Sequence, residues 1–423
     1  MCQNIGLKIV AMVCDQGSGN QSALNSLISE GHIHQEENRL SFDVNGKEII
    51  LIYDVPHLFK GVRNNLLNKE LHFKINGDKK VAKWDDIIDF YYLDTADSTR
   101  LCPKLTDLHV LPDKINKMKV SCCTQVFSNQ VGSLMKRISQ WDIQDEYKLK
   151  KSASDTADLI LFLDQLFDSL NSNSKIAPSS KPLKGGISKN SGHKQFWYDS
   201  LKIIRSMRYF SKDKKQYVST PSLKNLSKTA RGFIYLSEKL LAHGFKFILP
   251  REINQDPLEN FFAAIRSHGI RNTSPNVTQF TSSYKALLVN NFLSSHSPSS
   301  NCEEDFSDSA LDSLHCFLTG DSIPGVRPLE DDDGEDYSIP SHVSIQKRTR
   351  VGNATLNYIA GYVAKKALKD TNNCESCKKL LLHRKDFPEK NLEFIEARQY
   401  KGIKLLKPGH LIFFVATNVA KII

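Results

Sequence analysis

The first 67 residues alternate apolar runs and polar turns in the pattern of an α/β sheet domain. A continuous apolar run at 7–14 indicates a buried strand, and the polar turn after it leads into a helix. Two further strands at 40–44 and 48–54 are joined by Asn45-Gly46, a dipeptide typical of a tight hairpin turn. A second helix is expected over 57–67. The predicted order is therefore strand, helix, strand, strand, helix.

Beyond residue 84 the spacing of apolar residues is mostly helical. The stretch 171–193 is rich in Ser, Lys, Pro and Gly, which indicates a loop or linker. Residues 294–346 are acidic and rich in Ser, with little apolar periodicity, and are expected to be disordered. Helices are expected over 84–91, 157–170, 196–208, 224–243 and 354–368.

Charge is unevenly distributed along the 423 residues. The formal net charge is +10, yet residues 301–340 contain 12 acids and one base, so the remainder carries +21. A basic folded part favours a polyanionic partner such as a nucleic acid. The length corresponds to roughly two or three domains of ~150 residues each. The composition excludes a fibre, a disulfide-stabilised miniprotein and a wholly disordered chain.

Nine dispersed cysteines, an odd number, indicate a reduced intracellular setting rather than a disulfide framework. Neither a signal peptide nor a membrane span is expected, because the apolar runs near both ends of the sequence are short. The chain is therefore expected to be soluble. Cys374 and Cys377, with His383, are candidate zinc ligands, but a second close pair is missing.

Three carboxylates are candidate chemical groups. Asp15 follows the first strand, at the sheet edge where α/β proteins bind ligands, although an aspartate there also commonly caps the next helix. Asp256 and Glu259 share one face of a predicted helix, where two carboxylates suit Mg2+. With Pro257 between them, the same spacing fits an N-terminal capping box. Spacing alone leaves these alternatives open.

Basic side chains line one face of the helix expected over 57–67. His57, Lys60 and Arg63 form a strip that suits phosphate binding, and a solvated basic helix face is the alternative. Neither a Walker-type phosphate loop nor a dinucleotide-binding glycine motif occurs in the sequence. Any nucleotide would therefore bind in an unconventional way.

Seven segments, taken in order, resemble the P-element transposase family, which includes transposase-like proteins with a THAP domain. Together they extend over nearly the whole chain, and seven collinear segments are far more specific than any one of them. The segments are LKIVAMVCDQGSGN (7–20), YDVPHLFKGVRNNLL (53–67), RLCPKLTDLHV (100–110), MKVSCCTQVFS (118–128), LFDSLNS (166–172), INQDPLENFFAAIRSHGIRNTSPNVTQF (253–280) and LNYIAGYVAKK (356–366).

The resemblance implies an α/β RNase H-like catalytic domain interrupted by a mostly α-helical GTP-binding insertion domain. In the family, two aspartates and a glutamate hold two magnesium ions, which activate a water or a 3′-hydroxyl for attack on a DNA phosphodiester. Asp15 matches the second aspartate and Glu259 the glutamate, so both are expected to be catalytic metal ligands. Asp168 is expected to read guanine. The positions that match GTP contacts are Lys104, Val120, Asp168, Asn171 and Asp256.

The same resemblance implies partners and a location. The expected partners are transposon-end DNA and GTP, with Mg2+ as a cofactor, and the expected location is the nucleus. His57, Lys60 and Arg63 are expected to contact the DNA backbone. A homo-oligomer is left open, and no membrane partner is expected.

The resemblance further implies an incomplete catalytic unit. The first catalytic aspartate of the family lies on a strand before the segment 7–14, and no aspartate precedes Asp15. The family's N-terminal THAP domain also has no counterpart. We therefore expect an N-terminally truncated RNase H-like domain without autonomous activity. The alternatives are a domesticated, non-catalytic DNA- and GTP-binding protein, and a folded remnant without activity.

The expected domain organisation follows the resemblance. A basic folded body would be interrupted by the acidic segment, which carries most of the acidic excess. The expected parts are an N-terminal RNase H-like part at 1–75, the insertion at 76–245 with a flexible linker at 171–193, a C-terminal RNase H-like part with the glutamate helix at 246–293, the acidic disordered segment at 294–346 and a C-terminal helical region at 347–423.

Overall fold

The computed structural model divides into two compact units. The first comprises Met1–Lys117, Cys122–Asn254 and Val343–Ile423, and the second Met118–Ser121 and Gln255–His342. The acidic segment at 294–346 lies outside the described residues. The structure describes residues 6–30, 40–96, 100–140, 149–268, 272, 274–291, 350–371, 374–382, 395–396, 406–409 and 411–416.

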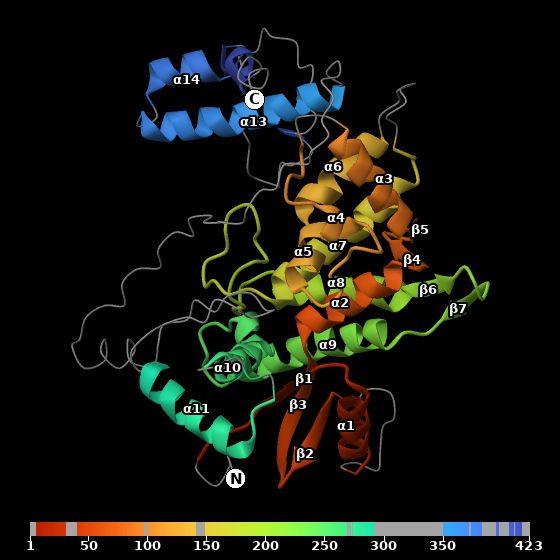
Figure 1. The fold of residues 1–423 in the computed structure, drawn as a ribbon, viewed down its shortest axis with the longest axis vertical. Helices are drawn as coiled ribbons and strands as arrows, with labels where there is room; N and C mark the ends of the chain where they lie inside the picture. The colour runs from red at the N-terminus through yellow and green to blue at the C-terminus, as the bar shows by residue number, and fades with distance from the viewer. Residues whose placement is uncertain are drawn as a thin grey trace. The chain divides into compact units, whose positions relative to one another are not determined.

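The first unit begins with a three-stranded sheet in the order β1-β3-β2. β1 (Ala11–Cys14) pairs in parallel with β3 (Lys47–Tyr53), and β2 (Ser41–Val44) pairs with β3 in the antiparallel sense. α1 (Ser18–Glu30) joins β1 to β2, and α2 (Val55–Leu66) follows β3 (Figure 1). The predicted order of the first five elements is confirmed. The hairpin turn is confirmed as well, because Asn45 and Gly46 have φ of 55° and 73°.

A second sheet, not expected from the sequence, has the order β5-β4-β6-β7 and is antiparallel throughout. Its first hairpin is β4 (Lys69–Ile75) and β5 (Asp78–Ala82), and its second is β6 (Arg208–Ser211) and β7 (Gln216–Val218). The first hairpin turns at Asn76-Gly77, with φ of 54° and 92°, so the Asn-Gly signal is present there too. The pairing of β4 with β6 places the segment before the helices α3 (Trp84–Thr95) to α8 (His193–Ser206) next to the segment after them.

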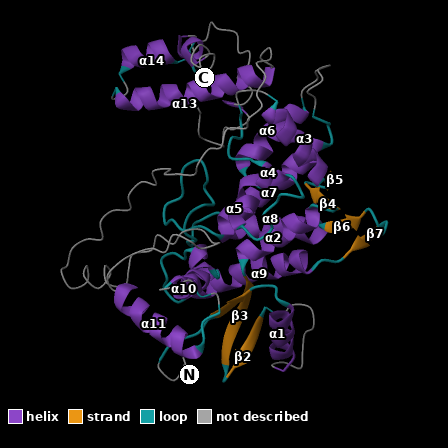
Figure 2. Cartoon of the chain, in the orientation of Figure 1, coloured by secondary structure: helices purple, strands orange, loops and turns teal. Residues whose placement is uncertain are grey.

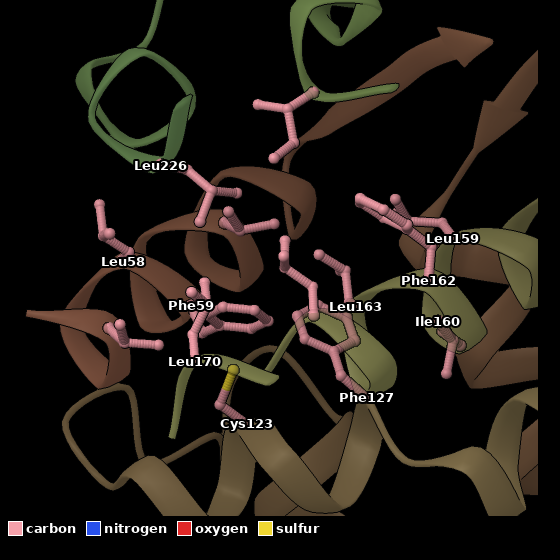
Figure 3. Packing of buried hydrophobic residues seen from close by; sticks show 14 of the residues in the cluster. Leu58, Phe59, Cys123, Phe127, Leu159, Ile160, Phe162, Leu163, Leu170 and Leu226 are labelled. Atoms are coloured by element: carbon pink, nitrogen blue, oxygen red, sulfur yellow. The ribbon is translucent and has the colours of Figure 1, made fainter. Parts of the chain in front are cut away.

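Helices around the second sheet pack into one apolar core (Figures 2 and 3). Leu163 and Leu170 of the long helix α7 lie close to Phe59 of α2, and the rings of Phe59 and Phe167 meet edge to face at 5.0 Å. The four helices expected between 84 and 243 are confirmed, except that Arg208 begins β6. The helices are α3 (Trp84–Thr95), α4 (Asp107–Val110), α5 (Val120–Val126), α6 (Asn129–Ser139), α7 (Ala153–Leu170), α8 (His193–Ser206) and α9 (Pro221–Ala242).

α9 packs against both β3 and α2, and thereby covers the first sheet. Gly232 permits this close approach, because a Cβ there would lie only 3.0 Å from the carbonyl oxygen of Leu51. One turn away, the hydroxyl of Thr229 accepts a hydrogen bond from the backbone N–H of Tyr53 at 3.0 Å. The helix was expected inside the insertion, and it connects that part of the chain to the N-terminal sheet.

The segment 171–193 has no helix or strand before His193, in agreement with the predicted loop. It is nevertheless packed against the body of the first unit. Ile187 is buried and forms an isolated β-bridge with Ile248, ahead of the short 3-10 helix η2 (Pro250–Ile253). The backbone of this loop is therefore held at Ile187, which exchanges hydrogen bonds with Ile248, and at Ser172, whose carbonyl accepts the Arg251 N–H.

His193, at the end of this loop, makes the stability of the first unit depend on pH. Its Nε2 donates to the Leu183 carbonyl at 3.0 Å, and burial lowers the pKa of the imidazole. Because the folded state disfavours the protonated ring, this stability is present above the unfolded pKa of about 6.5 and is lost as the pH falls below it. We expect thermal melting of His193→Gln to depend less steeply on pH below about 6.5. An equal change in the exposed His243→Gln variant would contradict this assignment.

The second unit contains α10 (Asp256–Ser267) and α11 (Val277–Asn291). Aromatic side chains pack between these helices, with Phe261 near Tyr284 at 5.8 Å and Phe262 near Phe280 at 6.4 Å between ring centroids. These contacts fix how α10 presents its first turn relative to α11.

The C-terminal part of the first unit contains α13 (Arg350–Asp370) and α14 (Glu375–Leu381), so the helix expected over 354–368 is confirmed. Within the described part of the chain, no helix is both long and apolar enough to cross a bilayer.

Candidate functional site

The parallel strands β1 and β3 end side by side, with Cys14 paired to Tyr53. The residues that follow, Asp15 and Asp54, stand at the same carboxyl edge, and the Asp54 N–H donates to the Cys14 carbonyl at 2.8 Å. This is the edge at which α/β sheets bind ligands. The structure places Asp15 where the sequence predicted it and adds a neighbouring carboxylate to which the sequence assigned no role.

Asp15 holds the turn before α1. Its Oδ1 accepts hydrogen bonds from the Gly17 N–H at 2.8 Å and from Asn20 Nδ2 at 2.7 Å. The Gly17 bond, then the Asn20 bond and the nearby charges of His57 and Lys60, hold the pKa of the carboxyl below its usual value against partial burial. Asp15 therefore holds a backbone amide of the turn that precedes α1, although Gly17 is not itself a residue of that helix. The carboxylate also stays ionised, which is the form that binds a divalent cation.

Asp54 caps α2 and orients His57. Its Oδ2 accepts the backbone N–H of His57 at 3.0 Å and lies 2.7 Å from the Nδ1 of the same residue. The carboxylate is buried, and the imidazole is partly exposed. The signal that could have identified this cap is an aspartate followed by Pro56 in the first turn.

The basic strip on α2 divides between two environments. His57 and Lys60 both help to lower the pKa of Asp15. Lys60 is nevertheless largely buried, with 8% of the residue exposed. Arg63 is 0% exposed, and its guanidinium donates to the carbonyls of Asn116 at 3.5 Å and Lys117 at 2.6 Å. A buried guanidinium that binds backbone carbonyls does not present itself to a DNA phosphate. The expected DNA contact of Arg63 is therefore corrected: its guanidinium holds the backbone at residues 116 and 117 against α2.

The last turn of α7 carries Asp168, and the C-cap position carries Asn171; both side chains are buried. Asp168 Oδ2 pairs with Lys181 Nζ at 2.7 Å, and Asn171 Oδ1 accepts a hydrogen bond from Asn254 Nδ2 at 2.9 Å. Sequence reasoning missed Lys181 and Asn254. Lys181 lies in the basic loop 171–193, which composition identified, and Asn254 lies in one of the seven quoted segments. Neither signal predicts which side chains these two residues contact.

Three further residues were expected to contact the nucleotide. Lys104 is exposed on a turn of the first unit. Val120, the first residue of α5, and Asp256 are buried; both belong to the second unit, whereas α5 from Cys122 onward belongs to the first. Asp256 is the first residue of α10. The N-cap of this helix is Gln255, and not Asp256 as the capping-box alternative required.

Metal ligands were expected at Asp15 and Glu259. Asp15 belongs to the first unit and the half-buried Glu259 to the second. The described residues contain no group of three or more His, Cys, Asp or Glu side chains arranged to hold a metal. Cys374 is exposed, and His383 lies outside the described residues, so a zinc site there stays a prediction.

Two family models match the chain. The TNP-like GTP-binding insertion domain matches residues 56–183, a range that contains Asp168, Asn171 and Lys181. The TNP-like RNase H C-terminal domain matches residues 252–285, which contain Glu259.

The chain is also similar to the transposable element P transposase of Drosophila melanogaster, with 26% identity over 372 residues, which cover 85% of this chain and 46% of the relative. It thus spans about half the length of that curated relative. Among solved structures, the Drosophila P element transposase strand transfer complex is similar with a TM-score of 0.56 and 24% identity, over 68% of this chain and 61% of that one. This second likeness shows the fold alone. Together, the matches confirm that the chain resembles the P-element transposase family in its GTP-binding insertion and in the C-terminal part of its RNase H domain.

Proposed function

We propose that the chain is a GTP- and DNA-binding part of a P-element-like transposase. The observation that carries this is the match of residues 56–183 to a GTP-binding insertion domain, because Asp168 and Asn171 lie within it. An ionised carboxylate accepts the two parallel donors of guanine, N1–H and the 2-amino group, which is the role we propose for Asp168. We propose Asn171, Lys104, Val120 and Asp256 as the further nucleotide contacts.

The proposed architecture is an RNase H-like domain interrupted by the insertion, with the boundaries 76 and 245. The pairing of β4 with β6 supports an interruption that begins after β4, because it brings together the chain segments before and after the helices α3 to α8. The packing of α9 on β3 supports a tight connection between the insertion and the N-terminal sheet.

The proposed parent chemistry is magnesium-dependent, GTP-assisted cleavage and strand transfer of DNA in the nucleus. Asp15 fits a magnesium ligand, because its carboxylate is ionised and both of its hydrogen bonds go to Oδ1. Glu259 would be the second ligand. Bound magnesium would stabilise the charge on the attacking and leaving oxygens. Lys60 would add positive charge for a DNA phosphate beside Asp15, and His57, held by Asp54, would do so in its protonated form.

We propose Asp15 and Glu259 as two of the three carboxylates of the family triad, and we propose that these 423 residues bind DNA without cleaving it on their own. A non-catalytic DNA- and GTP-binding function is the second candidate, and the charge of +21 outside residues 301–340 favours it.

Titration of GTP and ATP into the purified chain tests the proposed function. We expect saturable binding of GTP and binding of ATP weaker by roughly tenfold or more, because adenine lacks the two donors that Asp168 accepts. Affinity for duplex DNA should fall steeply as salt rises. Absence of GTP binding would sink the nucleotide assignment. Robust magnesium-dependent nicking by these residues alone would show that the proposed lack of cleavage is wrong.

A further inference from the structure

A buried ion-paired cluster lies at the end of α7. Asp164 and Asp168 are one helical turn apart on the same face, and Lys181 reaches back to both from the loop 171–193. Its Nζ lies 3.1 Å from Asp164 Oδ1, 3.3 Å from Asp164 Oδ2 and 2.7 Å from Asp168 Oδ2. The side chains of Asp164, Asp168 and Lys181 are 9%, 11% and 28% exposed.

The cluster concentrates negative charge in an unfavourable place. Two carboxylates one turn apart repel each other, and Asp168 lies in the last turn of a helix, where the helix dipole disfavours an anion. Burial raises the pKa of Asp164, although the Lys181 charge and the Asn129 N–H at the start of α6 oppose this. Within the described part of the chain, Lys181 is the cation that pairs with both carboxylates.

Recognition of guanine by Asp168 needs the ionised carboxylate. A protonated carboxyl group would direct an O–H donor toward the N–H donors of the base, and one hydrogen bond would be lost. An ionised carboxylate has about four lone-pair positions, so the contact to Lys181 at Oδ2 leaves acceptor capacity for a base. The lysine and guanine can therefore share Asp168.

We propose that Lys181 is a positioning residue for nucleotide recognition, which orients the Asp168 carboxylate and offsets its repulsion by Asp164. The inference rests on the proposed binding of GTP and extends it to a lysine that does not itself contact the base. It makes the loop 171–193 a part of guanine selection, because this loop carries the cation.

Four variants of the full chain test this role by GTP titration. Lys181→Met is expected to weaken GTP binding by roughly tenfold or more, because Asp168 then loses the cation that orients its carboxylate beside Asp164. Lys181→Arg should restore binding to within about threefold of the unaltered chain, since the positive charge is kept. The double variant Asp164→Asn with Lys181→Met should also recover, because the repelling carboxylate and the cation are removed together. Lys189→Met, an exposed lysine of the same loop, is the matched control and should bind like the unaltered chain.

The outcomes separate this role from a structural one and from the proposed function. Recovery of GTP binding in the double variant would support the positioning role. If Lys181 were needed only to fold the loop, the double variant would still lack it and would still bind GTP weakly. Undiminished GTP binding by Lys181→Met, or a double variant as weak as the single one, would overturn the role of Lys181 alone. If the unaltered chain binds no GTP, the proposed function itself fails. Thermal melting of each variant, run in parallel, reports any loss of folding.

Discussion

Replacement of Asp168 by Asn is expected to weaken GTP binding about 100-fold and to create binding of xanthosine triphosphate. The asparagine keeps one acceptor for N1–H but presents an N–H donor to the 2-amino group of guanine, where two donors then oppose each other. Xanthine has a carbonyl at this position, so the same amide donates to it. The change in base preference is a stronger result than a loss of affinity, because unfolding cannot produce it.

The fold should tolerate this substitution, because Lys181 keeps its ion pair with Asp164. Asp158→Asn is the matched control: it makes the same chemical change on the same helix, where Asp158 pairs with Lys80 at 2.9 Å. Isothermal titration with GTP and xanthosine triphosphate measures the preference of each variant. A variant at Asp168 that binds GTP as tightly as the unaltered chain, or a control that changes preference equally, would refute the assignment of Asp168 as the guanine reader.

Replacement of Arg63 by Met is expected to destabilise the first unit by about 3 kcal/mol, because the protein would lose the charge-assisted hydrogen bonds of a buried guanidinium. The guanidinium donates to the carbonyls of Asn116 and Lys117, and the side chain is completely buried. Methionine fills much of the volume with an apolar chain but cannot replace these hydrogen bonds. A drop in the melting temperature, measured by circular dichroism, checks the prediction.

The control for Arg63 is Lys224→Met, which removes one positive charge from an exposed position on α9. We expect it to leave the melting temperature nearly unchanged. Its affinity for DNA should fall by no more than the contribution of one phosphate contact. An Arg63→Met protein that melts like the unaltered chain but has lost affinity for DNA would show that the guanidinium is available to a phosphate. The burial argument would then be wrong.

Local sequence signals identified the elements whose residues interact with near neighbours. The Asn45-Gly46 turn and the apolar spacing of α7 each act within one hairpin or one element, and both predictions are confirmed. The strand expected over 7–14 is confirmed only as β1, Ala11–Cys14, and it is not buried as predicted, because Met12 is 40% exposed and only Cys14 is buried. The second sheet was not predicted, because β4 must pair with β6 far along the chain. The Asn76-Gly77 turn was a usable signal for half of that sheet.

The candidate site shows the same division between local and long-range information. The sequence by itself determined that Asp15 follows an apolar strand and that His57, Lys60 and Arg63 recur on one helix face. The tertiary structure decided which of these side chains are accessible: packing of the segment near residue 117 against α2 buries Arg63, although its spacing is that of an exposed basic strip. It also decided that Lys181 returns to Asp164 and Asp168. Periodicity describes one element at a time, whereas burial and ion pairing depend on the surfaces that other elements bring to it.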